Sequence, residues 1–288
     1  MNSMKKINFA FWGTPELASQ TLDILFECGY VPKVIITTPD QRSGRGMHTF
    51  ATPVALWAEK HKVKCLKPEK IDQELIKEFN KFNVDISVVV AYGKILPEIL
   101  IKIPKFGTIN VHYSFLPKYR GASPLEQALL NGDTITGVSI QQMEFKLDTG
   151  AIISENEMPI NINDTKNTLL ERLTDMGGKM LCEILPQIVE GKIHPKIQKE
   201  DDATYCKKIK KENGLINING NAMENYNKYR AFIGWPGVYF FVKINNKDIR
   251  VKITKAKLEN DSFVIEQVVP EGKKEINYGD FLKSNILK

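Results

Sequence analysis

The chain has 288 residues, with 40 Lys and Arg against 34 Asp and Glu, and a formal net charge of +6. A hydrophobic fraction of 42% with 26% charged residues is typical of a globular protein and excludes a disordered or fibrous chain. The length suits one large or two smaller domains, and no apolar run approaches the ~18 residues that a membrane span requires.

The cysteines lie far apart in the sequence. They are Cys28, Cys65, Cys182 and Cys206, and none belongs to a CxxC pair. This spacing argues against a zinc cluster and against a dense disulfide framework. The apolar stretch near the N-terminus is also too short for a secretory signal. We therefore expect a cytoplasmic protein with reduced thiols.

Strand and helix signals alternate through the first two-thirds of the chain. A strand over 7–12 leads into a helix that Thr14 is expected to cap and that ends near Gly29. Further strands are predicted over 34–38, 85–91, 107–112 and 136–142, and further helices over 52–62, 72–80, 124–131 and 165–190. The run in 85–91 is typical of a central parallel strand that is buried on both faces. The pattern predicts an α/β fold with an open, mostly parallel sheet covered by helices.

The pattern changes after residue 190. The sequence becomes polar and irregular, and we predict a catalytic domain over 1–190, a linker over 191–204 and a second domain over 205–288. Short strands at close spacing predict a small antiparallel barrel or sheet in the second domain. They cover 238–243, 249–256 and 262–268, with one helix near 222–232.

The charge is concentrated in the last third of the chain. Residues 1–190 hold 21 basic and 22 acidic side chains, for a net −1, whereas residues 191–288 hold 19 and 12, for a net +7. A basic module beside a neutral one suggests a polyanionic partner, nucleic acid first. The alternative is that a lysine-rich composition has drifted positive.

Asn110 and His112 form the first candidate for chemistry. They are two residues apart, so in a strand their side chains point to the same face. Histidine exchanges a proton near neutral pH, and an asparagine amide can donate to a developing oxyanion. Together they could handle a tetrahedral intermediate at a carbonyl group. The alternative is an ordinary strand end with a histidine whose polar atoms are satisfied.

Two further segments follow that pair. The loop 114–121 combines a proline, two cations and a glycine, and it could wrap a flat or anionic ligand or simply turn into the next helix. In the segment 147–150, Asp148 could orient His112, since a carboxylate beside an imidazole fixes its tautomer. The alternative there is a turn in which Gly150 supplies a positive φ.

The segment 38–46 is longer than the two to six residues or so that usually join a strand to a helix. It contains Arg42 and Arg45, two of only six arginines in the chain. Arginine favours planar, bidentate contacts, so this segment could order on a phosphate backbone or a base edge. The alternative is a solvated surface loop.

In this order the motifs resemble one family, the methionyl-tRNA formyltransferases. The matching segments span most of the chain: Phe11–Pro15, Asp40–Gly46, Val88–Pro97, Ile109–Gly121, Gly137–Met143, Leu147–Gly150 and Arg230–Gly237. The resemblance implies a Rossmann-like sheet with a smaller, OB-like C-terminal β-barrel. It also implies transfer of a formyl group from 10-formyltetrahydrofolate to the α-amine of initiator methionyl-tRNA.

The resemblance also assigns roles to residues. It makes Asn110, His112 and Asp148 catalytic, and it places Arg42, Arg45 and the basic C-terminal domain against the tRNA. The folate site would use Ser114, Phe115, Leu116, Pro117, Tyr92, Gly93 and Leu96. No metal and no membrane are implied, and we expect a monomer.

The sequence departs from the family pattern in two places. Met47–Phe50 stands where the family has further lysines, and 213–221 is rich in Asn and Ile. One alternative is a folate-dependent N-formyltransferase that acts on an amino sugar nucleotide or another small amine. A second is a non-catalytic module that binds folate or nucleic acid. The Arg45 segment and the basic last third favour tRNA over a small acceptor.

Overall fold

The computed structural model describes residues 7–43, 48–244 and 246–286, and the chain packs as two compact units. Unit 1 consists of residues up to Arg120 together with 137–158 and 170–205. Unit 2 consists of 121–136, 159–169 and 206–288. The domain boundaries predicted from composition, at 190 and 204, stay a prediction.

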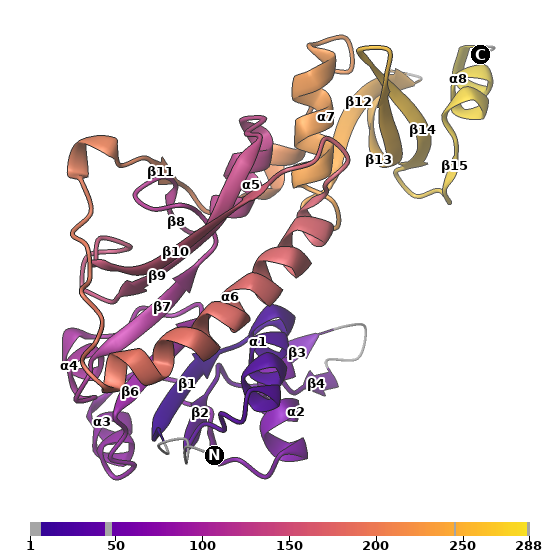
Figure 1. Cartoon of the computed structure of the whole chain (residues 1–288). Coiled ribbons are helices and arrows are strands. Elements are labelled where there is room, and N and C mark those ends of the chain that lie inside the picture. The colour runs from indigo at the N-terminus through magenta and orange to yellow at the C-terminus, as the bar shows by residue number, and fades with distance from the viewer. Residues whose placement is uncertain (1–6, 44–47, 245, 287–288) are drawn as a thin grey trace. The chain divides into compact units, whose positions relative to one another are not determined.

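A seven-stranded sheet forms the centre of unit 1, in the order β10-β9-β7-β6-β1-β2-β5 (Figure 1). The bounds are β1 (Phe9–Gly13), β2 (Val34–Ile36), β5 (Cys65–Leu66), β6 (Ile86–Val90), β7 (Thr108–His112), β9 (Ile135–Gln142) and β10 (Ile152–Pro159). The five strands that follow one another in the sheet as β7, β6, β1, β2 and β5 are parallel. β9 runs antiparallel to β7. The predicted open, mostly parallel sheet is confirmed, with β5 and β10 as strands that were not predicted.

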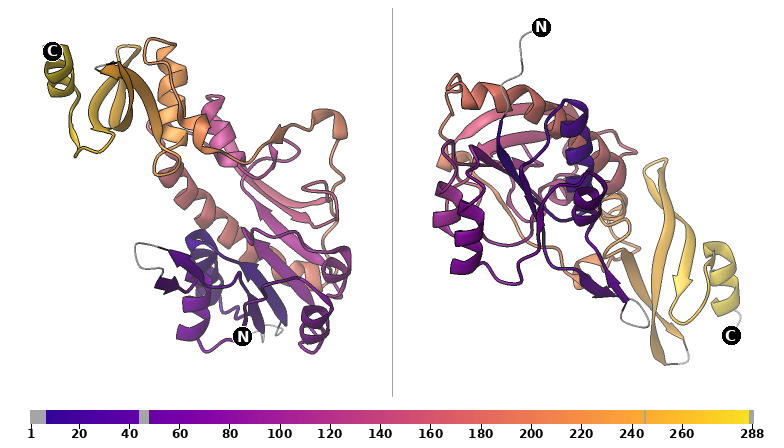
Figure 2. Two further views of the ribbon diagram at one scale, coloured as in Figure 1. Left: turned by 180° about the vertical axis from the view of Figure 1, so that it is seen from behind. Right: turned by 90° about the horizontal axis from the view of Figure 1, so that it is seen from below.

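Helices cover the sheet on both faces (Figure 2). They are α1 (Glu16–Glu27), α2 (Pro53–Lys60), α3 (Gln73–Asn80), α4 (Glu98–Lys102) and α6 (Lys166–Val189). On one face, Trp12 of β1 packs in a buried cluster with Phe79 of α3 and Leu100 of α4. Successive residues of a strand point to opposite faces, so Phe11 lies on the side of α1, where its ring approaches Gly13.

The glycines of α6 are points of close contact with neighbouring elements. A Cβ on Gly178 would lie 2.7 Å from the Ile24 side chain of α1, and a Cβ on Gly177 would lie 3.0 Å from Val111 of β7. α6 also continues through Pro186 to its end at Val189. The small residues therefore let α6 pack closely against α1 and the sheet.

Side chains cap two helices at the residues where the sequence predicts those helices to begin, and the one cap that the sequence predicted is absent. The Thr52 hydroxyl caps α2, and the Asp72 carboxylate caps α3. The predicted cap of α1 is wrong, because its N-cap is Pro15 and no side chain bonds there. Thr14 Oγ1 instead donates to the carbonyl oxygen of Tyr92 at 3.0 Å, which ties the loop after β1 to the loop after β6.

Unit 2 contains a four-stranded antiparallel sheet in the order β12-β13-β14-β15. Its elements are α5 (Pro124–Leu130), α7 (Ala222–Ala231), β12 (Val238–Ile244), β13 (Lys247–Glu259), β14 (Ser262–Pro270), β15 (Ile276–Asn277) and α8 (Tyr278–Ile286). The predicted antiparallel strands and their helix are confirmed. Within the described residues, this smaller antiparallel sheet is the second domain that the resemblance implied.

Two short ribbons complete the fold. β3 (Gln41–Ser43) pairs with β4 (His48–Phe50), so part of the segment predicted as a loop is paired in a two-stranded sheet. β8 (Arg120–Gly121) pairs with β11 (Tyr205–Cys206). The second pairing is consequential, because it brings the end of the predicted linker against the loop that follows His112.

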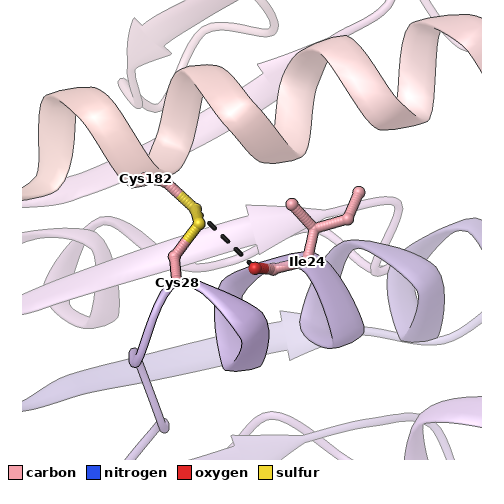
Figure 3. Close-up of a disulfide and its surroundings, with 3 residues drawn as sticks. All are labelled: Ile24, Cys28 and Cys182. Atoms are coloured by element: carbon pink, nitrogen blue, oxygen red, sulfur yellow. Dashed lines mark hydrogen bonds between the residues drawn. A yellow bond between two sulfur atoms is a disulfide. The ribbon is translucent and has the colours of Figure 1, made fainter.

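A disulfide joins Cys28, just after α1, to Cys182 on α6 (Figure 3). The two Cα atoms lie 6.2 Å apart, although the residues are separated by 154 positions in the sequence. The expectation of reduced thiols throughout is therefore wrong for this pair. Cys65 and Cys206 are free.

Breaking this disulfide is expected to destabilise the protein. A cross-link over 154 residues restricts the unfolded chain, so reduction should lower the free energy of unfolding by roughly 2–5 kcal/mol. Denaturant unfolding with and without a thiol reductant measures the change, and Cys28→Ser with Cys182→Ser should abolish the response to reductant. An unfolding midpoint of the oxidised protein that does not change when the reductant is added would contradict the expectation.

Candidate active site

The candidate site lies at the carboxyl edge of the sheet in unit 1. The chain order reverses between β1 and β6, and in open α/β sheets ligands bind beyond the carboxyl ends of the strands at such a point. The loops that follow β1, β6 and β7 meet at this edge because these three strands are parallel. The family motifs at 11–15, 88–97 and 109–121 are thereby brought to one place.

The pairing of β7 with β9 places four polar side chains on one face. Asn110 is opposite Gln141, and His112 is opposite Ser139. Cross-strand partners share a face of the sheet, and residues two apart on one strand do so as well. The sequence predicted Asn110 and His112 as site residues but gave the two partners on β9 only as part of a segment that matches the family.

His112 is 6% exposed, and both of its ring nitrogens face oxygen atoms. Nε2 lies 3.0 Å from the carbonyl oxygen of Tyr119, and since a carbonyl only accepts, Nε2 carries a proton. Nδ1 lies 3.8 Å from Oδ2 of Asp148, within ion-pair range but too far for a hydrogen bond. The Tyr119 carbonyl therefore sets the tautomer of His112, a role that we had expected of Asp148, and Nδ1 faces the carboxylate.

Asp148 sits in a tight turn that is fixed from two sides. Its φ is +53°, a left-handed conformation that residues other than glycine seldom adopt. Gln141 Nε2 donates to Asp148 Oδ1 at 2.8 Å. The proposed positive φ at Gly150 is wrong, and glycine is needed there for space, because a Cβ would lie 1.7 Å from the Gln142 carbonyl oxygen.

Asn110 keeps its amide available. The residue is half-buried, and among the residues that the structure describes its side chain has no hydrogen-bond partner. An amide at the end of β7, on the same face as His112, can donate to an oxygen that gains negative charge.

The predicted folate loop after His112 is rigid and partly open. Leu116 N–H donates to Ser139 Oγ at 2.9 Å, and Ser114 Oγ donates to the Lys118 carbonyl. Ser114 and Leu116 are buried. Phe115 is 41% exposed and Pro117 is half-buried, so these two are the side chains of the loop that a ligand can reach.

The predicted folate residues after β6 divide in the same way. Tyr92 and Leu96 belong to the buried core, where the Tyr92 ring lies 5.3 Å from that of Trp12. Burial raises the pKa of the Tyr92 phenol to about 12. Gly93 is exposed with φ +82°. In this segment the backbone and Gly93 can meet a ligand, whereas the Tyr92 and Leu96 side chains support the fold.

Arg120 is buried and bonded within the protein, although its place in the loop 114–121 suggested that it could bind a ligand. Its side chain is 1% exposed. The Nε atom donates to Gln198 Oε1 at 3.0 Å. The Nη1 atom donates to Glu200 Oε2 at 2.8 Å and to the Tyr205 hydroxyl. Burial alone would lower the Arg120 pKa, but the bonds to Glu200 and Tyr205 outweigh it and raise that pKa. Gln198 and Glu200 belong to the stretch predicted as a linker, and Tyr205 follows it directly.

The predicted tRNA contacts stay predictions. Arg42 lies on β3 opposite Thr49, and Arg45 lies outside the described residues. In the part of the chain that the structure describes, no helix is long and apolar enough to cross a membrane. No group of three or more His, Cys, Asp or Glu in that part is arranged to hold a metal ion.

The comparisons with known proteins agree with this arrangement. The Formyl transferase family model matches residues 5–185, and the model of the formyl transferase C-terminal domain matches residues 208–263. The methionyl-tRNA formyltransferase of a Sulfurihydrogenibium species is 42% identical over 250 residues, which cover 86% of this chain and 79% of the relative. That of Citrifermentans bemidjiense is 36% identical over 304 residues, covering 97% and 94%. The chain belongs to the methionyl-tRNA formyltransferase family.

Solved structures show the same fold. The methionyl-tRNA formyltransferase from Clostridium thermocellum matches with a TM-score of 0.62 at 15% identity, covering 94% of this chain and 99% of that one. An N-formyltransferase from Helicobacter canadensis, in complex with folinic acid and dTDP-3-aminofucose, matches with a TM-score of 0.65 at 23% identity, covering 88% of each chain. The resemblance stated from the motifs, and the fold class with it, are confirmed.

Proposed function

We propose that this chain transfers the formyl group of 10-formyltetrahydrofolate to the α-amine of initiator methionyl-tRNA, as a monomer in the cytoplasm. One observation carries the proposal. In a chain of this family, the Asn110 amide, the His112 ring and the Asp148 carboxylate converge at the carboxyl edge of the sheet. A module that only binds folate or nucleic acid has no need of that trio.

The residues account for the proton and charge movements of the reaction. When the amine attacks the formyl carbon, negative charge builds on the formyl oxygen, and the Asn110 amide donates to it. His112 Nδ1, the nitrogen not engaged by Tyr119, takes the proton that the amine loses and gives it to the leaving folate nitrogen. Asp148 stabilises the imidazolium in between.

The folate would lie against the open parts of the two neighbouring loops. Phe115 is 41% exposed and Ile95 is 82% exposed, which offers apolar surface to a flat heterocycle. Nothing lies within 4 Å of a Cβ built on Gly93, so the backbone there can be approached closely. The polar edge of the ring would then meet the backbone of 92–96.

The acceptor is assigned to tRNA by charge and by family. The last third of the chain carries the whole positive excess, and β13 alone holds four lysines and one arginine. A small acceptor such as an amino sugar nucleotide needs no such module, whereas a phosphate backbone does. Arg42 and Arg45 would contact the tRNA from unit 1.

Arg45→Ala is expected to weaken the use of charged tRNA and leave folate binding intact. Removing one phosphate contact should flatten the logarithmic salt dependence of kcat/KM for methionyl-tRNA by about one unit. Arg172→Ala, on α6, is the matched control. Loss of folate affinity in Arg45→Ala would show that this segment was assigned wrongly.

The proposed function is tested by identifying the product. The protein is incubated with 10-formyltetrahydrofolate and methionyl-tRNA, the ester bond is hydrolysed, and the released amino acid is identified by mass. N-formylmethionine is the expected product, at a rate that follows enzyme concentration. Release of unmodified methionine only, under conditions where the folate is bound, would contradict the proposal.

A further inference from the structure

Gln198 is a buried residue in the stretch 191–204, the stretch predicted to be a linker, and it is 8% exposed. We propose that Gln198 is a positioning residue that holds the Asp148 carboxylate toward His112. This role rests on the proposed function, since Asp148 and His112 act in formyl transfer there. Among the described residues, Gln198 makes no hydrogen bond to His112 or to the predicted folate residues Ser114–Pro117.

The first contacts of Gln198 are to the turn that carries Asp148. Its Nε2 donates to the carbonyl oxygen of Gly150 at 2.7 Å and to that of Asp148 at 3.0 Å. A side-chain amide has two N–H groups, so these two bonds use both of them. Asp148 has a left-handed φ of +53°, a conformation that Asp adopts more readily than most residues and that bonds to the turn help to hold. Gln198 supplies two of the bonds that do so.

A second path runs through Gln141, which reaches the carboxylate itself. Gln141 is 1% exposed, and its Nε2 donates to Asp148 Oδ1 at 2.8 Å. Its Oε1 lies 3.4 Å from Gln198 Nε2. The backbone and the side chain of Asp148 are thus both fixed by neighbouring glutamines.

Arg120 determines which way the Gln198 amide points. Arg120 Nε donates to Gln198 Oε1 at 3.0 Å, so the amide nitrogen must face the turn. Arg120 is held in turn by Glu200, which also pairs with Lys146 at 3.3 Å, just before the turn. Bonds from Arg120 and Lys146 lower the pKa of Glu200, so it stays ionised and paired with both cations near neutral pH.

The geometry at His112 makes this support consequential. The 3.8 Å between His112 Nδ1 and Asp148 Oδ2 is within ion-pair range but too long for a hydrogen bond between these two groups. The bond from Gln141 and the conformation of the turn therefore contribute to where the Asp148 carboxylate lies. A misplacement of about 1 Å in a reacting group can cost a factor of the order of 10² in rate.

The kinetic test uses two substitutions of Gln198 and one control. Gln198→Met keeps the volume and removes every hydrogen bond, and Gln198→Glu keeps an acceptor for Arg120 but cannot donate to the turn. Both should lower kcat roughly 10- to 100-fold while KM for 10-formyltetrahydrofolate stays within about twofold. Gln187→Met, an exposed glutamine on α6, should leave both constants unchanged. If Gln198→Met does not fold, Gln198→Glu, which keeps the bond to Arg120, carries the test alone.

A double-mutant cycle separates positioning from a general structural effect. Single-turnover rates are measured for each Gln198 variant in the wild-type chain and in Asp148→Asn. If Gln198 acts through the carboxylate, its substitution costs little further rate in Asp148→Asn. An equal loss in both backgrounds, or wild-type kcat in the Gln198 variants, would overturn the inference and leave the proposed function standing. A wild-type protein that transfers no formyl group would instead overturn the proposed function.

Discussion

His112→Ala is expected to lower the single-turnover rate of formyl transfer roughly 10²- to 10⁴-fold, the range that a general acid–base group contributes. Nδ1 is the ring nitrogen that faces Asp148, and the substitution removes the proton transfer proposed for it. The rate is measured with enzyme in excess over methionyl-tRNA, so that product release does not limit it.

The His112→Ala variant also loses the bond from Nε2 to the Tyr119 carbonyl, so its folding is checked by its unfolding midpoint. His194→Ala, at an exposed position, is the matched control and should transfer at the wild-type rate. A folded His112→Ala variant with a near-normal rate would remove the histidine from the mechanism.

Asn110→Ala is expected to lower the same rate about 10²- to 10³-fold, the loss that follows removal of one donor to an oxyanion. The Asn110 amide is half-buried and lies on the His112 face of β7, so its removal takes away stabilisation of the transition state and little of the fold. KM for the folate should change far less than kcat.

Asn110→Asp makes this expectation sharper. The substitution keeps the size of the side chain but replaces the donor with a carboxylate that only accepts, so its rate should fall at least as far as that of Asn110→Ala. If Asn110→Asp transferred formyl faster than Asn110→Ala, donation to the formyl oxygen would not be the role of this residue.

The sequence was sufficient for the local parts of this fold. Alternation and apolar runs predicted β1, β6 and β7, and Thr52 and Asp72 signalled the starts of two helices. These signals are local, because caps and strand periodicity depend on residues a few positions apart. The failure at Thr14 has the opposite cause, since its hydroxyl is drawn to Tyr92, 78 residues away.

The central residues of the candidate site could be predicted from the sequence, whereas the residue that holds the turn at Asp148 could not. Asn110, His112 and Asp148 lie in motifs that the family resemblance singles out, although local chemistry alone leaves an ordinary alternative for each. Gln198 lies in a polar, irregular stretch, and its bonds to Arg120 and to the turn at Asp148 span 78 and 50 residues. No pattern within the stretch distinguishes a buried glutamine from a solvated one, so only the pairing of β8 with β11 reveals it.

A competition between two acceptors tests the central claim most directly. The wild-type protein is given 10-formyltetrahydrofolate with equal concentrations of charged initiator methionyl-tRNA and a dTDP-linked amino sugar, and both products are quantified from the same reaction. The ratio of the initial rates then equals the ratio of the two kcat/KM values. We predict that the formyl group appears almost entirely as N-formylmethionine on the tRNA. Preferential formylation of the amino sugar would contradict the assignment of the acceptor.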